Sequence, residues 1–508
     1  MIWLLLSCVS ETPCSDGFGR DAAGACVPLS TDTDSGEASG GTAAEGGSSD
    51  DAEAYEAPPE LGSALDLRLS LTRSEHMPTA LQAVWTGPDG VDSWLEVEGR
   101  DERFAEGRSS VVLLAPEGTE LVVRAVTEVE GERIESEPVS ASTGTFERPL
   151  DLPMQQLSEA SAVSELVVLL AYEDADARRV VLATGAGELL WQLDDEQLGD
   201  SAPVSAQVDL SGAGVLVGQW AGHAPTLTTA RMQDNAIWRY GWDGAPEVEL
   251  ATPMAHHLFS QPAPGYVVWS GLDLEQREHD VLPVAFERLV ISEIDGDDVT
   301  HYATSELGWD GTCTSGGYYA DACDVHHANS MDCDLDSELC LYSLHNIDGV
   351  FEVSLSGELQ ADFATWPARS SSGESLQGFD RAHDLHWADD GSILVFNDGS
   401  TGAWASRYAV DREAGTLTEL WSYGRDDCIA SSALGTVQEL ASGNHLVGFS
   451  TPNNLLREVD PDGRVLWELD LGGLQDGQRC DEVAVTSVLG EARALTSDQL
   501  GPGVVAIF

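Results

Sequence analysis

A β-prone stretch recurs along the C-terminal part of the chain with a period near fifty residues. Each stretch of four to six residues follows a small residue, and the six starts are Gly212, Gly265, Ser337, Gly391, Gly443 and Gly490. The intervals between them are 53, 72, 54, 52 and 47 residues. Strands repeated at this period, with turn residues and no helical periodicity between them, are typical of a β-propeller rather than a solenoid or a TIM barrel. We therefore predict an all-β fold with a six-bladed β-propeller over residues 150–508.

Ring closure follows from the same reasoning. A ring left open would expose strand edges that pair with other chains. We predict that the early strand at 166–171 closes the ring by pairing with the C-terminal strand at 504–508.

The segment before the propeller has a different pattern. Residues 63–148 alternate apolar and polar side chains over several short strands, which predicts a β-sandwich. This segment resembles a fibronectin type III module, with Trp85 as a core aromatic residue, and its simplest role is a spacer or a brace for the propeller. Residues 31–62 are rich in Gly, Ser, Ala and acidic residues and have no basic residue. That composition cannot bury a core, so we predict a flexible acidic linker.

The first thirty residues suggest export. Residues 1–8 end in Leu5-Leu6-Ser7-Cys8, which resembles a bacterial lipoprotein signal with a lipid on Cys8, although no basic residue precedes a short apolar run. A start codon placed too late in the gene accounts for that short run. Residues 9–30 form a small Cys-containing segment. We predict an exported cell-envelope lipoprotein that meets the membrane only through this lipid.

Cysteine usage fits an oxidising compartment. Eight cysteines remain beyond Cys8, and the simplest local pairing joins Cys14 with Cys26, Cys313 with Cys323, Cys333 with Cys340, and Cys428 with Cys480. The alternative is a zinc site using Cys323, His326 and His327, but no Cys-x-x-Cys pair completes a tetrahedral set. The acidic runs lack the full calcium-loop spacing. We therefore predict no dedicated metal site.

The charge balance excludes one class of partner. The chain carries 88 acidic and 24 basic residues, a net charge of −64, and every basic residue is Arg. Nucleic-acid binding requires the opposite charge, so we predict none. The acidic surface favours a salt-rich habitat, whereas GC-rich codon usage equally explains Arg in place of Lys.

Seven of the twelve histidines fall in four short stretches. His257 lies eight residues before Gly265 and His383 eight before Gly391, so both occupy the same position in the repeat. His327 fits that position with a two-residue insertion. Equivalent positions of successive blades face the central axis, so we predict that the three imidazoles converge on one site. The alternative is that each histidine only caps its own inner strand.

These motifs resemble one family, the PAPS-independent aryl sulfotransferases, which are exported bacterial six-bladed propellers preceded by a small β-sandwich. The resemblance covers most of residues 65–508. Its most specific parts are His327-Ala-Asn329-Ser-Met-Asp, Leu341-Tyr-Ser343-Leu-His345-Asn346, and His383-Asp384 followed by Gly391-Ser-Ile-Leu-Val-Phe-Asn-Asp-Gly.

The resemblance implies a reaction without any cofactor. A phenolic sulfate donor gives its sulfuryl group to a histidine, matched here by His383, and a phenol acceptor then takes it. His327 and His257 match two further active-site histidines, although the adjacent His256 leaves that last assignment open. Imidazole is a competent nucleophile and a general acid and base near neutral pH, and we expect Asp384 to orient His383.

One position departs from the family pattern, because its active-site Arg falls at His345. Imidazole is cationic only below about pH 6.5, so the site loses a permanent cation. Three readings follow: His345 works protonated among carboxylates, Arg407 reaches in from another blade, or the site no longer turns over. The first reading predicts an activity that rises as the pH falls from 8 to 6.

Two other functions compete with sulfuryl transfer. A non-catalytic cell-surface propeller of the same descent would bind a ligand or a partner protein, and the missing Arg favours it. A quinone-dependent dehydrogenase is suggested only by fourteen Trp, which are better explained by packing between blades. The sequence predicts no particular oligomeric state.

Overall fold

The structure is a computed structural model that describes most of the chain. It covers residues 18–20, 26–28 and 67–508, apart from gaps at 89–90, 175–177, 200–201, 221–226, 295, 297, 316–317, 399–401, 426, 428, 432 and 473–486. The predicted signal at 1–8 and the linker at 31–62 lie outside the described residues. Within the 9–30 segment, β1 (Phe18–Arg20) and β2 (Cys26–Pro28) form an antiparallel pair.

From Met154 onward, the described residues form six sheets of four to six strands, each built on an antiparallel meander of four. The first three sheets contain β14 (Ala202–Val208), β15 (Gly214–Trp220), β16 (Ala236–Gly241) and β17 (Pro246–Ala251); β18 (Ala255–Ser260), β19 (Tyr266–Glu275), β20 (Val284–Glu293), β21 (Asp298–Ala303) and β22 (Cys323–Asp324); and β23 (Ala328–Asp334), β24 (Leu339–Leu344), β25 (Gly349–Ser354) and β26 (Leu359–Asp362).

The other three sheets complete the series. They contain β29 (Ala382–Trp387), β30 (Ile393–Asn397), β31 (Trp404–Asp411) and β32 (Thr416–Tyr423) with β27 (Ala368–Arg369) and β28 (Ser375–Leu376); β33 (Thr436–Glu439), β34 (His445–Phe449), β35 (Leu455–Val459) and β36 (Val465–Asp470) with β10 (Met154–Gln156); and β37 (Ser487–Leu495), β11 (Val167–Asp174), β12 (Arg178–Thr184) and β13 (Leu189–Leu193).

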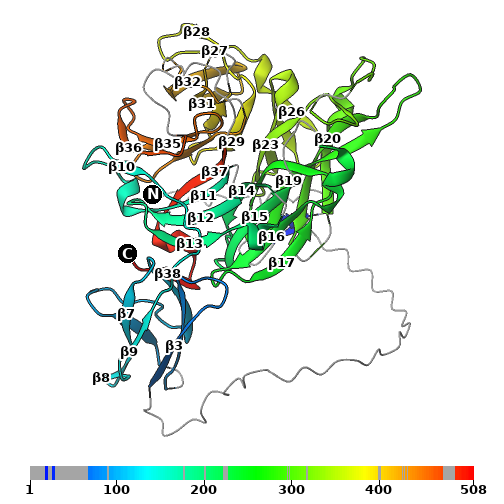
Figure 1. Cartoon of the computed structure of the whole chain (residues 1–508). Helices are drawn as coiled ribbons and strands as arrows, with labels where there is room; N and C mark the ends of the chain where they lie inside the picture. Colours follow the sequence, from blue (N-terminus) through cyan, green and yellow to red (C-terminus); the bar gives the residue numbers. More distant parts are fainter. Residues whose placement is uncertain are drawn as a thin grey trace, which may run out of the picture.

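The first strand of each sheet lines a common cavity. This cavity of about 310 Å³ is bordered by residues on β14, β18, β23, β29, β33 and β37, among them Gln207, Leu258, Asp332, Asp384, Val437 and Arg493. Six sheets that share one axial cavity are consistent with a β-propeller, and their radial arrangement is visible in Figure 1.

The hydrophobic core is divided among the interfaces between neighbouring sheets. Six clusters of buried residues each join two adjacent sheets, and the last cluster joins the β11–β13 sheet back to β14 and β15. Trp191, Trp269 and Trp467 are fully buried in these clusters. Replacing one of them by Ala would cost about 3 to 5 kcal/mol. These three tryptophans pack between blades, as the sequence suggested.

The repeat starts identify the second strand of five sheets. Gly212, Gly265, Gly391 and Gly443 have φ between 75° and 83°, so each turn uses the left-handed conformation that Gly adopts without strain. At the Ser337 repeat, the neighbouring Glu338 takes that conformation instead, with φ 58°. The Gly490 repeat was assigned wrongly, because Gly490 lies within β37, the innermost strand of its sheet.

Ring closure also differs from the prediction. The early strand β11 pairs with β37 in an antiparallel register from Val167↔Leu495 to Asp174↔Ser487. The C-terminal strand β38 (Val504–Ala506) instead pairs in parallel with β6 (Ser110–Leu114), outside the six sheets. β38 is the more apolar of the two candidate strands, because β37 contains Glu491 and Arg493, so the apolar pattern alone favoured the wrong strand.

The N-terminal residues from Arg68 to Ser142 form two sheets at one end of the six (Figure 1). One has the order β3 (Arg68–Arg73), β4 (Ala80–Thr86), β6, β38, and the other joins β5 (Ser93–Val97), β7 (Glu120–Val129), β8 (Glu132–Glu135) and β9 (Val139–Ser142). One hydrophobic cluster draws residues from both sheets and includes Trp85 and Ile507. The likeness of this unit to a fibronectin type III module remains a prediction.

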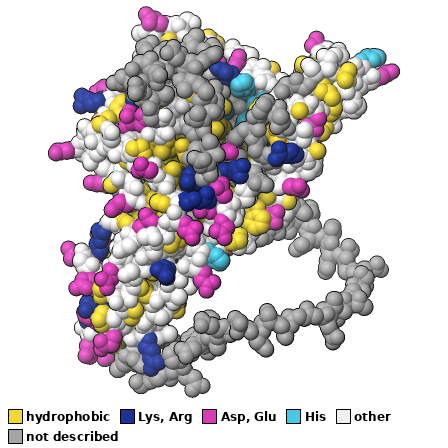
Figure 2. Space-filling view, in the orientation of Figure 1, with side chains coloured by type: hydrophobic (Ala, Val, Ile, Leu, Met, Phe, Trp, Pro, Cys, Tyr) yellow, Lys and Arg dark blue, Asp and Glu magenta, His cyan; other side chains and the backbone are white. Residues whose placement is uncertain are grey.

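Two of the predicted disulfides are present, Cys313–Cys323 and Cys333–Cys340. The pairs Cys14–Cys26 and Cys428–Cys480 rest on residues outside the described part of the chain. Two disulfides fit an extracytoplasmic location. Among the described residues, no helix is long and apolar enough to cross a membrane. Figure 2 shows acidic side chains dispersed over both parts of the molecule rather than gathered in one patch.

Candidate active site

The three histidines of the shared repeat position lie together where three consecutive inner strands begin. His257 lies in β18, His327 immediately precedes β23, and His383 lies in β29. The ring centroids of His257 and His327 are 4.5 Å apart, and those of His257 and His383 are 6.0 Å apart. All three side chains are buried. We call these residues, together with the adjacent His256 and His345, the histidine cluster.

Irregular backbone aims these side chains. The ladders β18–β19, β23–β24 and β29–β30 each shift register near the histidine, between Ala255 and Phe259, Ala328 and Ser330, and His383 and His386. The backbone φ is 61° at His257 and 55° at His327, a left-handed conformation that costs a residue with a Cβ atom about 1 to 2 kcal/mol. Register shifts of this kind redirect side chains near functional sites.

His327 is held between a carboxylate and a second imidazole. Its Nδ1 lies 2.6 Å from Oδ2 of Asp324, and its Nε2 lies 2.5 Å from Nε2 of His257. Burial alone would lower the pKa of His327, but the Asp324 carboxylate outweighs it, so that pKa is raised. Burial likewise opposes ionisation of Asp324, yet the His327 imidazole holds the Asp324 pKa below its usual value. Asp324 therefore favours the protonated form of His327, which can act as a proton donor.

The carboxylate beside His383 is not the one predicted. Its Nε2 lies 3.0 Å from Oδ2 of Asp398, and its Nδ1 finds no hydrogen-bond partner among the described residues. Asp384 turns into the axial cavity, where Arg493 donates to both of its carboxylate oxygens at 2.6 and 2.8 Å. The prediction that Asp384 orients His383 is therefore wrong. Asp384 has a left-handed backbone φ of 43° within the register shift between His383 and His386, and this irregular backbone directs the two neighbours apart.

His256 has its own carboxylate partner. Its Nε2 lies 2.9 and 3.1 Å from the two oxygens of Glu287, which also accepts hydrogen bonds from the hydroxyl of Ser270 and the backbone N–H of Ala328. A carboxylate accepts, so Nε2 of His256 carries the proton and Nδ1 keeps its lone pair. That Nδ1 is buried and has no hydrogen-bond partner in the described part of the chain.

The surroundings of His345 do not favour its cationic form. Its ring lies 5.6 Å from that of His327, and its Nδ1 contacts the side-chain oxygen of Asn346 at 2.9 Å. Burial lowers the pKa of His345, and the positive charges of His327, His383 and Arg381 lower it further. The reading in which His345 works protonated among carboxylates is therefore not supported.

Arg407 does not supply the missing cation. Its guanidinium pairs with Asp390 at 3.0 Å and with Glu439 at 2.6 Å. Arg381 is the guanidinium whose charge reaches His345. It contacts the carbonyl oxygen of Asp398 and lies 3.5 Å from Oδ1 of Asp380, which places a permanent cation beside the carboxylate partner of His383.

Sequence reasoning missed the partners of the histidine cluster. Glu287, Asp324, Asp398 and Arg381 come from strands or turns whose register the sequence alone does not give. A signal existed for Asp398, because it ends the Gly391 motif two residues after Phe396, the strand partner of His383. Another existed for Arg381, which lies two residues before His383 and so belongs to the same turn.

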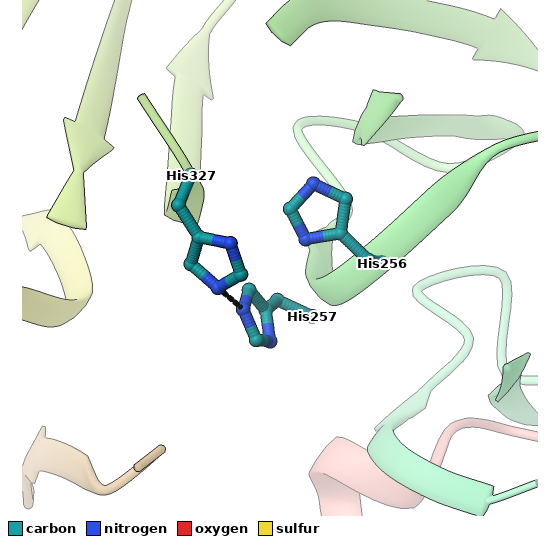
Figure 3. Close-up of side chains that lie close together, drawn as sticks. All are labelled: His256, His257 and His327. Carbon is teal, nitrogen blue, oxygen red and sulfur yellow. Dashed lines mark hydrogen bonds between the residues drawn. The ribbon is translucent and has the colours of Figure 1, made fainter. Parts of the chain in front are cut away.

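The predicted zinc alternative fails on two counts. Cys323 is committed to the disulfide with Cys313, so it cannot act as a thiolate ligand. His326 lies apart from the histidine cluster, with its Nδ1 2.8 Å from the hydroxyl of Thr304, and burial lowers its pKa. His256, His257 and His327 instead bring three ring nitrogens within 4.8 Å of one another. Figure 3 shows these three imidazoles facing one another from two neighbouring sheets.

Comparison with known proteins gives only distant likenesses. No family model matches the chain, and no curated protein matches it. A protein of unknown function from Bacteroides caccae covers 64% of this chain and 98% of its own length at 12% identity, with a TM-score of 0.39. The periplasmic gluconolactonase PpgL of Pseudomonas aeruginosa covers 80% and 99% at 13% identity, with a TM-score of 0.36.

A catalytically inactive virginiamycin B lyase from Staphylococcus aureus covers 65% of this chain and 77% of its own at 8% identity, with a TM-score of 0.28. These are distant similarities to β-propeller proteins, and at such scores they carry no functional argument. The resemblance to aryl sulfotransferases therefore remains a prediction that rests on the motifs of this chain.

Proposed function

We propose that this protein is an exported aryl sulfotransferase that moves a sulfuryl group from a phenolic sulfate to a phenol through a sulfohistidine on His383. The observation that carries the proposal is the meeting of His257, His327 and His383 from three consecutive sheets at one point. Each imidazole has a distinct environment, which suits a nucleophile and an acid–base pair better than three strand caps do.

In the first half-reaction, the imidazole nitrogen of His383 attacks sulfur. Nδ1 is the candidate atom because Nε2 faces Asp398. The sulfur–nitrogen bond forms as the bond from sulfur to the phenolic oxygen breaks. His327 donates a proton to the departing phenolate, since the Asp324 carboxylate raises its pKa and favours its protonated form. Asp398 stabilises the positive charge that develops on the His383 ring.

In the second half-reaction, the acceptor phenol gives its proton to His327 while its oxygen attacks sulfur. The sulfur–nitrogen bond then breaks and returns neutral His383. The sulfuryl oxygens carry negative charge throughout, so they need fixed donors around them. Arg381 is a permanent cation whose charge reaches His345, and we assign it the role that the family gives to the Arg replaced by His345.

The decisive experiment is intact-mass analysis of the folded protein after brief incubation with 4-nitrophenyl sulfate. We expect a sulfuryl adduct on the wild type and none on His383→Ala. The matched control is His386→Ala, which removes a histidine from the same strand, β29, and should keep the adduct. The absence of both adduct and 4-nitrophenol between pH 5.5 and 8 would overturn the proposal.

The burial of the reacting ring favours one alternative. The His383 side chain is only 2% exposed, so a donor must displace covering residues to reach it. A non-catalytic propeller that binds a ligand or partner protein would need no such access. Binding of aryl sulfates without any adduct, measured by calorimetry, would support that alternative.

The sequence motifs also suggest how the protein is attached to a membrane. We propose that Cys8 carries a lipid and that the unit resembling a fibronectin type III module braces the propeller. Mass analysis of detergent-extracted protein tests the lipid, because Cys8→Ala should lose both the added mass and the membrane association. Unmodified Cys8 in membrane-bound wild-type protein would contradict it.

A further inference from the structure

Three imidazoles of the histidine cluster present their ring nitrogens to a common point. His256, His257 and His327 are all buried, and one ring nitrogen from each lies within 4.8 Å of those of the other two. Figure 3 shows His257 and His327 meeting nitrogen to nitrogen, with His256 beside them. Neutral imidazole is the commonest protein ligand for divalent transition metals, and three imidazoles this close together can bind one ion.

Two of these rings each have their own carboxylate partner on the second ring nitrogen. Glu287 accepts the Nε2–H of His256, and this fixes the tautomer that leaves Nδ1 with its lone pair directed inward. Asp324 faces Nδ1 of His327 at 2.6 Å and likewise leaves Nε2 as the inward atom. Metal-ligating histidines almost always direct their other ring nitrogen to such a partner, which orients the ring and strengthens the ligand.

The negative charges beside the histidine cluster favour a bound cation. Glu287 and Asp324 are both buried at their side chains, and their oxygens lie within 4.8 Å of a ring nitrogen of His327. Even with His327 protonated, two buried carboxylates leave a net negative charge, which is expensive without a counter-ion. A single divalent ion would neutralise it.

We infer that His256, His257 and His327 bind one divalent transition-metal ion, with Zn²⁺ as the best match to three imidazole ligands. Ligands about 2.1 Å from a tetrahedral ion lie roughly 3.4 Å apart, so the 2.5 Å contact between His257 and His327 opens by roughly 1 Å when the ion enters. Three ligands leave a fourth position for water or an anion. The inference does not rest on sulfuryl transfer. A zinc-bound His327, whose Nδ1 faces Asp324, has no nitrogen left to donate a proton to a phenolate, so the metal-bound state and the proposed reaction exclude each other.

The test uses the full-length protein without an affinity tag, stripped with EDTA and titrated with ZnCl₂ in a calorimeter. We expect about one Zn²⁺ per chain. Glu287→Gln should weaken binding roughly 10- to 100-fold, and His256→Gln should weaken it more because it removes a ligand. His326→Gln is the matched control: it alters a buried histidine next to the cluster and should leave the affinity unchanged. Equal affinity in all four proteins would overturn the inference.

A second measurement on the wild type covers the case in which a variant fails to fold. X-ray absorption at the zinc edge should report three imidazole nitrogens at about 2.0 to 2.1 Å. A shell of sulfur, or of oxygen alone, would overturn the inference. Zinc held in this way by a protein that forms no sulfuryl adduct overturns the proposed function and leaves the metal site standing. A sulfuryl adduct on a protein that binds no zinc supports the proposed function and overturns the metal site.

Discussion

Histidine occupies two contrasting environments in this molecule. In the histidine cluster, His256, His327 and His383 each lie beside a buried carboxylate. His445, on β34, is equally buried but stacks on Trp421 with a ring separation of 3.7 Å. Neither of its ring nitrogens finds a hydrogen-bond partner among the described residues.

The contrast shows how burial alone differs from burial with a carboxylate. Burial lowers the pKa of His445 to about 4, helped by the charge of Arg407. At His327 the same burial is outweighed by Asp324, and the pKa is raised. A buried neutral imidazole only fills space in the core. A carboxylate beside an imidazole fixes which ring nitrogen carries the proton and stabilises the protonated ring. The second kind gathers where three consecutive sheets meet.

The strongest test of the contrast removes a carboxylate and keeps the ring. Asp398→Asn is nearly the same size as the wild type but no longer stabilises a charged His383 ring. We expect adduct formation from 4-nitrophenyl sulfate to slow roughly 10²- to 10⁴-fold, followed by rapid-quench mass analysis. Asp390→Asn, which alters an exposed carboxylate paired with Arg407, is the control and should react normally. An unchanged rate in Asp398→Asn would remove Asp398 from the mechanism.

His445 should make the fold sensitive to acid. The unfolded chain binds a proton at His445 below its ordinary pKa near 6.5, but the folded protein does not do so until about pH 4. Stability therefore falls as the pH drops through this interval, by up to about 3 kcal/mol from this group. His445→Phe keeps the stacked ring and cannot titrate. Urea unfolding at pH 7 and pH 4.5 should show a smaller loss in the variant, and equal losses would contradict the assignment.

The two histidine environments also differ in backbone conformation. His257 has a φ of 61°, whereas His445 lies in the regular strand β34. Glycine relieves the strain at the first position only. We expect His257→Gly to cost about 1 to 2 kcal/mol less than His445→Gly in urea unfolding. Equal costs would mean that the left-handed conformation at His257 stores no strain.

The smallest expected effect concerns two arginines. Arg381 lowers the pKa of His345 and Arg407 lowers that of His445, in both cases after the larger effect of burial. Removing a nearby cation favours the charged imidazole, so each pKa should rise in Arg381→Gln and Arg407→Gln respectively. Histidine ring shifts followed by NMR across pH report both values. A fall in either pKa would show that another charge controls it.

Much of the fold was predictable because it repeats. A turn residue in the left-handed conformation precedes the second strand of five sheets, so local chemistry fixed the register there. The sixth unit was misread because β37 resembles the other starts in sequence but takes the innermost place. The shared position of His257, His327 and His383 was also predictable, since equal spacing within a repeat becomes proximity around an axis.

The partners of those histidines were not predictable in the same way. Asp384 is adjacent to His383 in sequence, yet the irregular backbone at the register shift directs it to Arg493 in the axial cavity. Asp398 is fifteen residues away from His383 and lies beside it only because of strand pairing and a register shift. His256 looked like a duplicate of His257, and only Glu287, from β20, gives it a separate role.

The strand β38 has a consequence for the order in which the molecule can be completed. It adds to the sheet of β6, whose other members come from the beginning of the described chain, and Ile507 enters the same hydrophobic cluster. During synthesis or passage through an export channel, the N-terminal unit emerges long before the strand that finishes it. The first part to appear is thus among the last to mature, and until then its open sheet edge must be kept from pairing with other chains.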